Sequence, residues 1–287
     1  MEVSKNINNV QQTVLKMKRE GRMIGIVPTM GYLHEGHIRL IEKAKTDNDF
    51  VVLTIFVNPL QFGESEDLNA YPRDEKRDLD KAEELGVDLV FLPNEKTMYP
   101  GPLSLNISVV RRADVLCGKS RPGHFEGVAM VLTKLFNICQ PDNAYFGKKD
   151  AQQVAVVDAL IEDFNFPIRL NPVDTVREHD GLAKSSRNVN LTSGERMEAP
   201  SIHQALEFGK DLFCRGEKTA GKIVEQTRQF LEARTHGKID YIELLSYPEL
   251  EVIEEIDQQV ILAAAVFYKK ARLIDNIIIN KDGCITM

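Results

Sequence analysis

The sequence predicts an α/β protein in which a mostly parallel sheet, covered by helices, is followed by a smaller α+β domain. Up to about residue 175, short apolar runs alternate with helical patterns, which is typical of parallel strands joined by covering helices. Beyond Ser185–Asn188 the order changes, because two helical segments come first and three strand-like segments follow. We therefore expect domains at residues 1–175 and 176–287, with no flexible linker between them.

Three apolar runs in the first domain are predicted strands. Met23–Val27 ends at a proline, Phe50–Val57 is nearly all apolar, and Val87–Leu92 also ends at a proline. We expect one helix from about His34 or Glu35 to Lys45, and a charged amphipathic helix over Asp74–Leu85.

The same alternation continues in the rest of this domain. Gly127–Ile138 carries its apolar residues on one helical face, and Asn143–Phe146 is a short strand. A helix over Ala151–Asp163 and a strand over Ile168–Val173 complete the pattern. Ligands of parallel sheets lie beyond the carboxyl ends of the strands. We therefore expect the loops after the first, second and fourth of these strands to lie together.

The smaller domain is expected to begin with two consecutive helices, Glu195–Arg215 and Ala220–Thr235. Strands with short links follow over Ile239–Leu245, Gln259–Tyr268 and Arg272–Ile279. This order predicts a small antiparallel sheet. We expect the domain to act as a lid.

Composition and charge narrow the class of protein. The chain has 43% hydrophobic and 28% charged residues, as soluble globular proteins do. Its 36 basic and 43 acidic residues leave both domains acidic, which argues against binding to nucleic acid or an anionic membrane. The longest apolar run, Val260–Tyr268, is far shorter than the ~20 residues of a membrane span.

The cysteines and the N-terminus predict a cytoplasmic protein. Cys117, Cys139, Cys214 and Cys284 are scattered, with no C-x-x-C pair, so we expect reduced thiols. The polar N-terminus shows no signal peptide.

The strongest chemical signal is Pro28-Thr-Met-Gly-Tyr-Leu-His-Glu-Gly-His37, between a predicted strand and a helix. If the helix begins near His34, then His34 and His37 share one face, with Cβ atoms ~5–6 Å apart. A helix N-terminus favours anions, and imidazoles can donate hydrogen bonds to a phosphate chain. A helix cap with two surface histidines is the alternative, but the strand–loop–helix context favours a phosphate site.

Two cationic segments are further candidates. Lys184-Ser-Ser-Arg187 offers positive charge and hydroxyls at the domain boundary, where the alternative is a solvated connection. In Phe146-Gly-Lys-Lys-Asp-Ala-Gln-Gln153, Lys149 can neutralise a phosphate, while Asp150 can cap a helix or support a magnesium shell. The adjacent glutamines at its end point in different directions, so at most one is expected to face a ligand.

The segment Phe56–Phe62 offers uncharged polar groups beside an aromatic ring. Asn58 and Gln61 suit a small ligand that has hydroxyl groups and a hydrocarbon part. The alternative is a loop in which asparagine is a turn residue. His124 and His179 have no clear predicted role.

Together these segments resemble one family. His34-Glu-Gly-His37 is similar to the "HIGH" signature of the nucleotidyltransferase and class I synthetase superfamily, and Lys184–Arg187 falls where its "KMSKS"-type loop lies. The fuller set resembles the pantothenate synthetase (pantoate–β-alanine ligase) family. Its other segments are Phe56–Phe62, Tyr71–Asp74, Arg121–Val128, Phe146–Gln153, Ser185–Asn188 and Ala271–Asn276.

The resemblance implies ATP-dependent joining of pantoate to β-alanine through a pantoyl-adenylate, with AMP and pyrophosphate as the other products. It also implies a Rossmann-like N-terminal domain, Mg²⁺ and a homodimer. Two residues depart from the family pattern. Lys148 stands where relatives often carry an acidic or amide residue, and Lys184 stands where they often carry an apolar one.

The resemblance also assigns roles by position. His37 is the proton-donating group. We expect His34, Lys149 and Arg187 to be catalytic as well, because they can offset the charge that develops as an acid attacks ATP. Gln61 contacts pantoate and later β-alanine, Gln153 contacts pantoate, and we expect Asn58 to contact substrate as well. The expected ATP contacts are Met30, Gly31, Tyr32, Leu33, His34, Glu35, Gly36, His37, Gly147, Lys148, Lys149, Asp150, Val176, Lys184, Ser185, Ser186 and Arg187.

Other functions predict different products or a different charge balance. A plain nucleotidyltransferase would release pyrophosphate but not AMP, and a non-catalytic nucleotide-binding module would release nothing. A tRNA-charging enzyme is disfavoured by the acidic balance of both domains.

Overall fold

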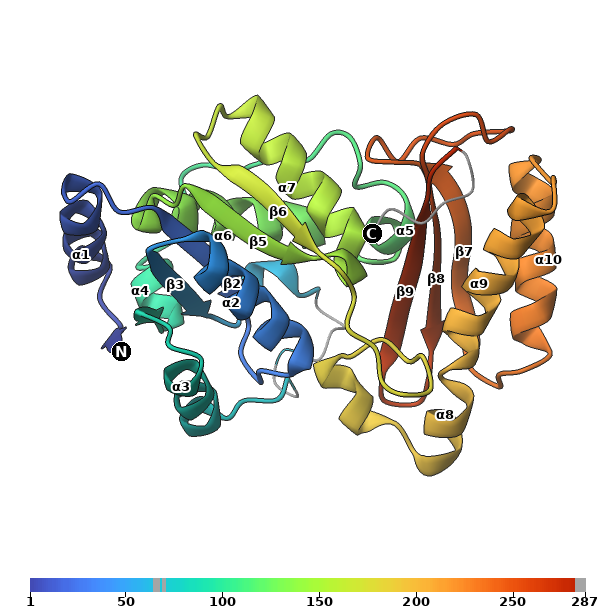
Figure 1. The fold of residues 1–287 in the computed structure, drawn as a ribbon, viewed down its shortest axis with the longest axis horizontal. Helices are drawn as coiled ribbons and strands as arrows, with labels where there is room; N and C mark the ends of the chain where they lie inside the picture. Colours follow the sequence, from blue (N-terminus) through green and yellow to red (C-terminus); the bar gives the residue numbers. More distant parts are fainter. Residues whose placement is uncertain (64–67, 69–70, 282–287) are drawn as a thin grey trace. The chain divides into compact units, whose positions relative to one another are not determined.

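The chain divides into two compact units (Figure 1). The computed structural model describes residues 1–63, 68 and 71–281, so Cys284 lies outside the described residues. Unit 1 comprises Met1–Val110, Arg121–Lys148 and Val156–Val173. Unit 2 comprises Arg111–Ser120, Lys149–Ala155 and the chain from Asp174 onward.

Unit 1 is built on a six-stranded sheet in the order β1-β4-β3-β2-β5-β6, in which every pairing is parallel. The strands are β1 Glu2–Ser4, β2 Ile24–Thr29, β3 Phe50–Ile55, β4 Leu89–Phe91, β5 Asn143–Gly147 and β6 Arg169–Val173. Successive residues of a strand face opposite sides of a sheet. Both Ile26 and Val27 are fully buried, so the sheet is covered on both faces.

Helices cover this sheet with the apolar faces that the sequence provides. Leu40, Ile41 and Ala44 of α2 join Leu53 of β3 and Ala82 of α3 in one buried cluster. Helix α1 lies beside α6 and buries only two residues, which explains why so polar a segment was not predicted as a helix. The helices are α1 Ile7–Arg19, α2 Glu35–Asp47, α3 Glu75–Glu84, α4 Glu95–Met98, α6 His124–Cys139 and α7 Ala151–Asp163.

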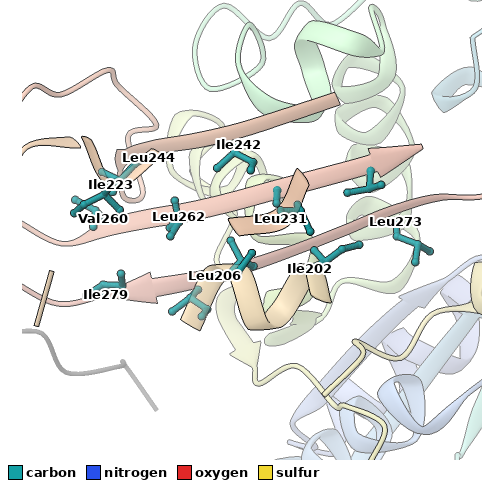
Figure 2. Packing of buried hydrophobic residues seen from close by; sticks show 14 of the residues in the cluster. Ile202, Leu206, Ile223, Leu231, Ile242, Leu244, Val260, Leu262, Leu273 and Ile279 are labelled. Atoms are coloured by element: carbon teal, nitrogen blue, oxygen red, sulfur yellow. The ribbon is translucent and has the colours of Figure 1, made fainter. Parts of the chain in front are cut away.

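Unit 2 contains a three-stranded antiparallel sheet in the order β7-β8-β9. Figure 2 shows Ile202 and Leu206 of α9 and Ile223 of α10 in one buried cluster with strand residues such as Leu244 and Leu262. The elements are α5 Leu116–Ser120, α8 Ser193–Glu198, α9 Ser201–Cys214, α10 Ala220–Glu232, β7 Lys238–Ser246, β8 Val260–Phe267 and β9 Arg272–Ile279.

These two sheets confirm the predicted fold class, but two details of the smaller domain were wrong. The predicted helix Glu195–Arg215 is two helices, because Pro200 has no N–H to donate and its ring obstructs a continuous helix. The link between β7 and β8, residues 247–259, is as long as the predicted strand bounds imply, so the expectation of a short link was wrong. Among the described residues, no helix combines the length and the apolar character that crossing a membrane requires.

The strand order indicates where a ligand would bind on the parallel sheet, namely at the carboxyl ends of the strands next to β2. Strands β3 and β4 lie on one side of β2, and β5 and β6 lie on the other, so the order reverses beside β2. In open parallel sheets, ligands bind beyond the carboxyl ends of the strands at such a reversal. The segments that follow β2, β3 and β5 carry the predicted site residues other than Val176 and Lys184–Arg187, which come after β6.

Candidate active site

The two histidines of the loop after β2 cap the following helix. His34 is the N-cap residue of α2, and its Nδ1 accepts a hydrogen bond of 3.1 Å from the Gly36 N–H. The Nδ1 of His37 accepts one of 3.3 Å from the His34 N–H. The ring centroids are 4.0 Å apart. The predicted shared face is therefore present, and the capping that was considered as the alternative occurs as well.

This capping fixes which ring nitrogen of each histidine carries the proton. A nitrogen that accepts a hydrogen bond must be unprotonated, and a neutral imidazole then carries its proton on the other nitrogen. His34 and His37 thus have Nε2–H donors next to the positive end of the α2 dipole. Two N–H donors at a helix N-terminus are suited to an anionic ligand.

Gly36 allows the two histidines to adopt this geometry. A Cβ atom at position 36 would lie 2.9 Å from Cε1 and 3.0 Å from Nδ1 of His34. Any side chain there would displace the imidazole. The glycine within His34-Glu-Gly-His37 is therefore required by close packing on the ring.

The segment after β3 holds a glutamine by means of a buried asparagine. Asn58 is 1% exposed, and its Nδ2 donates to Gln61 Oε1 at 3.1 Å and to the Gly127 carbonyl at 3.0 Å. Its Oδ1 accepts the Tyr99 hydroxyl at 2.8 Å. Burial raises the pKa of Tyr99, so this hydroxyl keeps the proton that it donates. The Asn58 amide is thus engaged in internal contacts that orient Gln61.

Gln61 also lies next to the start of α6 and to the loop after β2, Met30–His37, which we call the histidine loop. Its Nε2 donates to the Met30 sulfur at 3.4 Å. Its carbonyl receives bonds of 2.8 Å from His124 Nδ1 and 3.4 Å from Arg121. Arg121 also contacts His124 Nε2 at 3.1 Å, and because a guanidinium only donates, the proton of His124 lies on Nδ1. Sequence reasoning gave His124 no role, and the structure shows that it holds Gln61.

In unit 2, the two glutamines at the start of α7 differ as predicted. Gln152 is buried, and its amide bonds the Cys117 N–H at 2.9 Å and the Arg112 and Val115 carbonyls at 3.0 and 2.8 Å. Gln153 is half-buried. Its proposed contact with substrate stays a prediction.

Lys149 of the same unit has contacts through both its side chain and its backbone carbonyl. Its side chain is 17% exposed and lies 3.6 Å from the Asp150 carboxylate, while its carbonyl accepts the Asn276 side chain at 2.9 Å. Gly147 and Lys148, which precede it, are half-buried at the end of β5 in unit 1.

The second cationic segment forms a tight hairpin in unit 2. The Lys184 N–H donates to the Val176 carbonyl at 2.9 Å, and Arg177 pairs with Ala183. The hydroxyl of Ser185 accepts the Arg187 N–H at 3.2 Å and starts a short 3₁₀ helix. Ser186 is buried at 7% exposure.

Ion pairs attach this hairpin to its surroundings within unit 2. Arg196 binds Glu178 at 2.6 Å and Asp180 at 2.5 Å, and its guanidinium lowers the pKa of Asp180. Arg177 binds Asp275 of β9 through two bonds of 2.6 and 3.0 Å. Lys184 lies 3.8 Å from Glu178.

Sequence reasoning missed the residues that anchor the two phosphate-site candidates. Asp78 holds the histidine loop of unit 1, and Arg196 holds the hairpin of unit 2. Neither belongs to a quoted motif, and both lie on helices whose charged residues are typical of a solvated surface. His179 is exposed.

The described residues contain no group of three or more His, Cys, Asp or Glu side chains that is arranged to hold a metal ion. Magnesium that bridges substrate phosphates needs only one or two protein carboxylates.

A parallel sheet with a reversed strand order and a histidine-capped helix beside that reversal define an α/β protein of the doubly wound class. The family model described as pantoate-beta-alanine ligase matches residues 2–278. The chain therefore belongs to the pantoate–β-alanine ligase family, and it is a ligase that forms an amide bond.

Curated relatives and solved structures agree with this family. The chain is 57% identical to the pantothenate synthetase of Geobacillus thermodenitrificans (strain NG80-2), over 96% of this chain and 95% of that protein. It is 56% identical to that of Bacillus subtilis (strain 168), over 96% of each. The crystal structure of pantothenate synthetase from Thermus thermophilus has a TM-score of 0.91 and 38% identity, and the match covers 96% of this chain and 99% of that one.

A further solved structure is of a complex. The pantoate-beta-alanine ligase from Francisella tularensis, complexed with beta-gamma ATP and beta-alanine, has a TM-score of 0.79 and 35% identity. The match covers 98% of each chain.

Proposed function

We propose that this chain activates pantoate with ATP as a pantoyl-adenylate, which β-alanine then converts to pantothenate. AMP and pyrophosphate are the other products. The observation that carries the proposal is the pair of Nε2–H donors of His34 and His37, at a helix N-terminus beside the reversal in strand order. The Francisella relative, a complex with beta-gamma ATP and beta-alanine, supports these substrates.

In the first step, a carboxylate oxygen of pantoate attacks the α-phosphorus of ATP. The bond from that phosphorus to the bridging oxygen breaks, and the electron pair leaves with pyrophosphate. An anion approaches a polyanion in this step, so preorganised positive charge and N–H donors lower the barrier. In our proposal His34, His37, Lys149 and Arg187 supply them, and His37 donates its hydrogen bond to the leaving phosphates.

The other nucleotide contacts are proposed from the same chemistry. Gly147 ends β5 with no side chain in the way, and Asp150 is an exposed carboxylate suited to the water shell of a magnesium ion. When bound, Mg²⁺ would offset charge on the phosphates. The remaining proposed contacts are Met30–His37, Lys148, Val176 and Lys184–Arg187.

In the second step, the free amine of β-alanine attacks the carbonyl carbon of the adenylate. The bond between this carbon and the AMP oxygen breaks, the nitrogen loses a proton, and an amide forms. Alignment of the two reactants is the main contribution of the protein. We propose that Gln61 contacts pantoate and then β-alanine, that Gln153 contacts pantoate, and that Asn58 acts on substrate by orienting Gln61.

The homodimer is also part of the proposal. From Leu103 to Val109 apolar and polar residues alternate, as in a strand, yet the structure places no strand there. Leu105 and Val110 are 81% and 85% exposed. An exposed apolar segment of this kind is suited to association with a second copy. Light scattering should give the mass of a dimer, and Leu105→Glu should lower it.

Cytoplasmic location, a domain boundary at 175/176 and a lid role for the smaller domain complete the proposal. Cys117 and Cys139 are buried free thiols, which is compatible with a reducing compartment. If the lid excludes water, the adenylate should persist in wild-type enzyme without β-alanine. Rapid hydrolysis to pantoate and AMP would contradict the lid.

The decisive experiment incubates the protein with ATP, Mg²⁺ and pantoate, with and without β-alanine. AMP, pyrophosphate and pantothenate are followed by mass spectrometry. We expect pantothenate only when every component is present, with one AMP for each pantothenate. Pyrophosphate without AMP would instead indicate a plain nucleotidyltransferase.

A further inference from the structure

Asp78 is a buried carboxylate that the function described above does not use. It lies on α3 and is 1% exposed. Its Oδ2 accepts the Tyr32 N–H at 2.6 Å, and its Oδ1 accepts the Leu33 N–H at 2.7 Å. Both oxygens thus bind the two residues that immediately precede His34.

These backbone groups need a partner because of the shape of the loop. Gly31 and Tyr32 have φ values of +84° and +52°, so the chain turns away from the hydrogen-bonding ladder of β2. Buried N–H groups that have left a sheet must find another acceptor. A carboxylate is the strongest acceptor available, because its bonds to N–H groups are charge-assisted.

The same helix also holds the other side of the loop. Arg77 and Lys81 each donate to the Leu33 carbonyl at 3.2 Å, and Arg77 lies over the Tyr32 ring at 4.7 Å. A Cβ atom at Gly31 would lie 2.9 Å from Asp78 Oδ2, so the loop packs directly on the carboxylate. Helix α3 therefore fixes the backbone from which the His34 side chain projects.

The burial of this carboxyl lowers the stability of the fold, whereas an uncharged side chain at this position would not be penalised in this way. Desolvation raises the pKa of Asp78, although the Leu33 and Tyr32 N–H groups oppose the shift. Above its ordinary pKa range, the buried ionised form therefore reduces stability. An anion beneath a loop that receives phosphates is also unfavourable electrostatically. We therefore attribute the presence of a buried aspartate here to the conformation that it gives to the backbone of Tyr32 and Leu33.

We propose that Asp78 is a positioning residue, which aligns His34 and His37 for the triphosphate by fixing Tyr32 and Leu33. The inference rests on the proposed function of the histidine loop. It assigns no contact between Asp78 and substrate.

The test compares Asp78→Asn with Asp142→Asn. Asparagine keeps the size of aspartate but turns one acceptor into a donor that faces an N–H group. Asp142 is the matched control, because it accepts the Ile24 N–H at 2.7 Å at the opposite end of β2. Misplacement of catalytic groups by about 1 Å can cost ~100-fold in rate, so we expect kcat of Asp78→Asn to fall about 10- to 100-fold. The KM for β-alanine should stay unchanged, and Asp142→Asn should keep its kcat.

A second readout does not depend on activity. In wild-type protein labelled with ¹⁵N-histidine, His34 and His37 should each show an unprotonated Nδ1 and a protonated Nε2. Asp78→Asn should shift these signals toward averaged values, and Asp142→Asn should not. If Asp78→Asn loses stability yet keeps both its kcat and these signals, Asp78 is only structural and the proposal is overturned.

Failure of the proposed function and failure of the variant to fold can both be distinguished from failure of the positioning role. If the wild-type protein forms no pantothenate, the proposed function fails, while the histidine signals still test the positioning. If Asp78→Asn does not fold, amide hydrogen exchange of the wild-type protein takes its place. The Tyr32 and Leu33 amides should be protected, and rapid exchange of both would overturn the proposal.

Discussion

The two segments proposed to bind phosphate are held in opposite ways. The histidine loop, Met30–His37, rests on the buried Asp78 carboxylate and on a helix whose first turn its own side chains cap. The hairpin segment, Val176–Arg187, is held by ion pairs whose side chains keep partial contact with water, such as Arg196 at 29% and Asp180 at 27% exposed.

Because of this difference, salt and pH should affect the interactions that hold each segment to different degrees. Bonds to backbone groups in a buried loop are little affected by salt, whereas partly exposed ion pairs are screened. The histidine loop is therefore a preorganised part of the fold, and the hairpin segment responds to ionic strength and pH. The predictions below test this contrast, from the largest expected effect to the smallest.

Replacement of His37 by alanine should have the largest effect, because it removes both an N–H donor and half of the capping pair. Loss of one preorganised donor costs ~2.7–4 kcal/mol in transition-state binding, which corresponds to a rate about 100- to 1000-fold lower. Steady-state kinetics of pantothenate formation measures this. His236→Ala is the control, since that side chain is 97% exposed. A folded His37→Ala protein with near-normal turnover would refute the site.

Arg196→Met should detach the hairpin segment from α8. It leaves Glu178 and Asp180 without their shared partner. Because both ion pairs are partly exposed, we expect the free energy of unfolding to fall by about 1–3 kcal/mol. Denaturant unfolding measures the loss, which should shrink in high salt. Lys222→Met, at a pair with 66% exposed lysine, is the control. A loss that is equal at low and high salt would contradict the contrast.

Mild acid should weaken the surroundings of the hairpin segment through His203. Burial and the nearby Arg177 lower the pKa of His203, whose ring faces Asp275, Glu207 and Lys210. As pH falls below about 6.5, the unfolded chain takes up a proton that the folded chain does not, so the free energy of unfolding falls by up to ~1.4 kcal/mol per pH unit.

His203→Gln should flatten this part of the stability profile. Denaturant unfolding at pH 7.5, 6.5 and 5.5 gives the slope for each protein, and His236→Gln serves as the exposed control. Equal slopes in wild type and His203→Gln would rule out the assignment.

Lys184→Met should have the smallest effect. The lysine lies 3.8 Å from Glu178, so its removal exposes that carboxylate to an approaching nucleotide as well as removing a cation. Partly exposed pairs contribute ~0.5–1 kcal/mol, and we expect the KM for ATP to rise about two- to five-fold. Kinetics at low and high salt should show the effect fading with salt. An unchanged KM for ATP would contradict the proposed contribution of Lys184 to the nucleotide site.

The sequence was sufficient for the sheets and for the histidine pair. Runs such as Phe50–Val57 are buried on both faces in a parallel sheet, and this leaves a continuous apolar signal. The spacing of His34 and His37 is a local property of a helix start, so it could be read without knowledge of tertiary contacts. Pro200 was also visible, and its break of the predicted helix should have been expected.

The anchors could not be predicted in this way because they depend on contacts distant in sequence. Asp78 meets Tyr32 across 46 positions, and His124 meets Gln61 across 63. In the sequence Asp78 is one of many charges on an amphipathic helix, whose pattern says nothing of which carboxylate is buried. Asn58 was predicted to contact substrate, which stays a prediction, and only the structure shows that its amide donates to Gln61.

The histidine cap has a consequence for how this enzyme can change over time. His34 and His37 each begin α2 through one ring nitrogen and present the opposite one as a donor. Asparagine or aspartate at position 34 would still start the helix, yet it would remove the imidazole donor. If the proposed site is right, thermal robustness and turnover share the same two side chains, and a laboratory selection for heat tolerance that must preserve growth should leave both positions untouched.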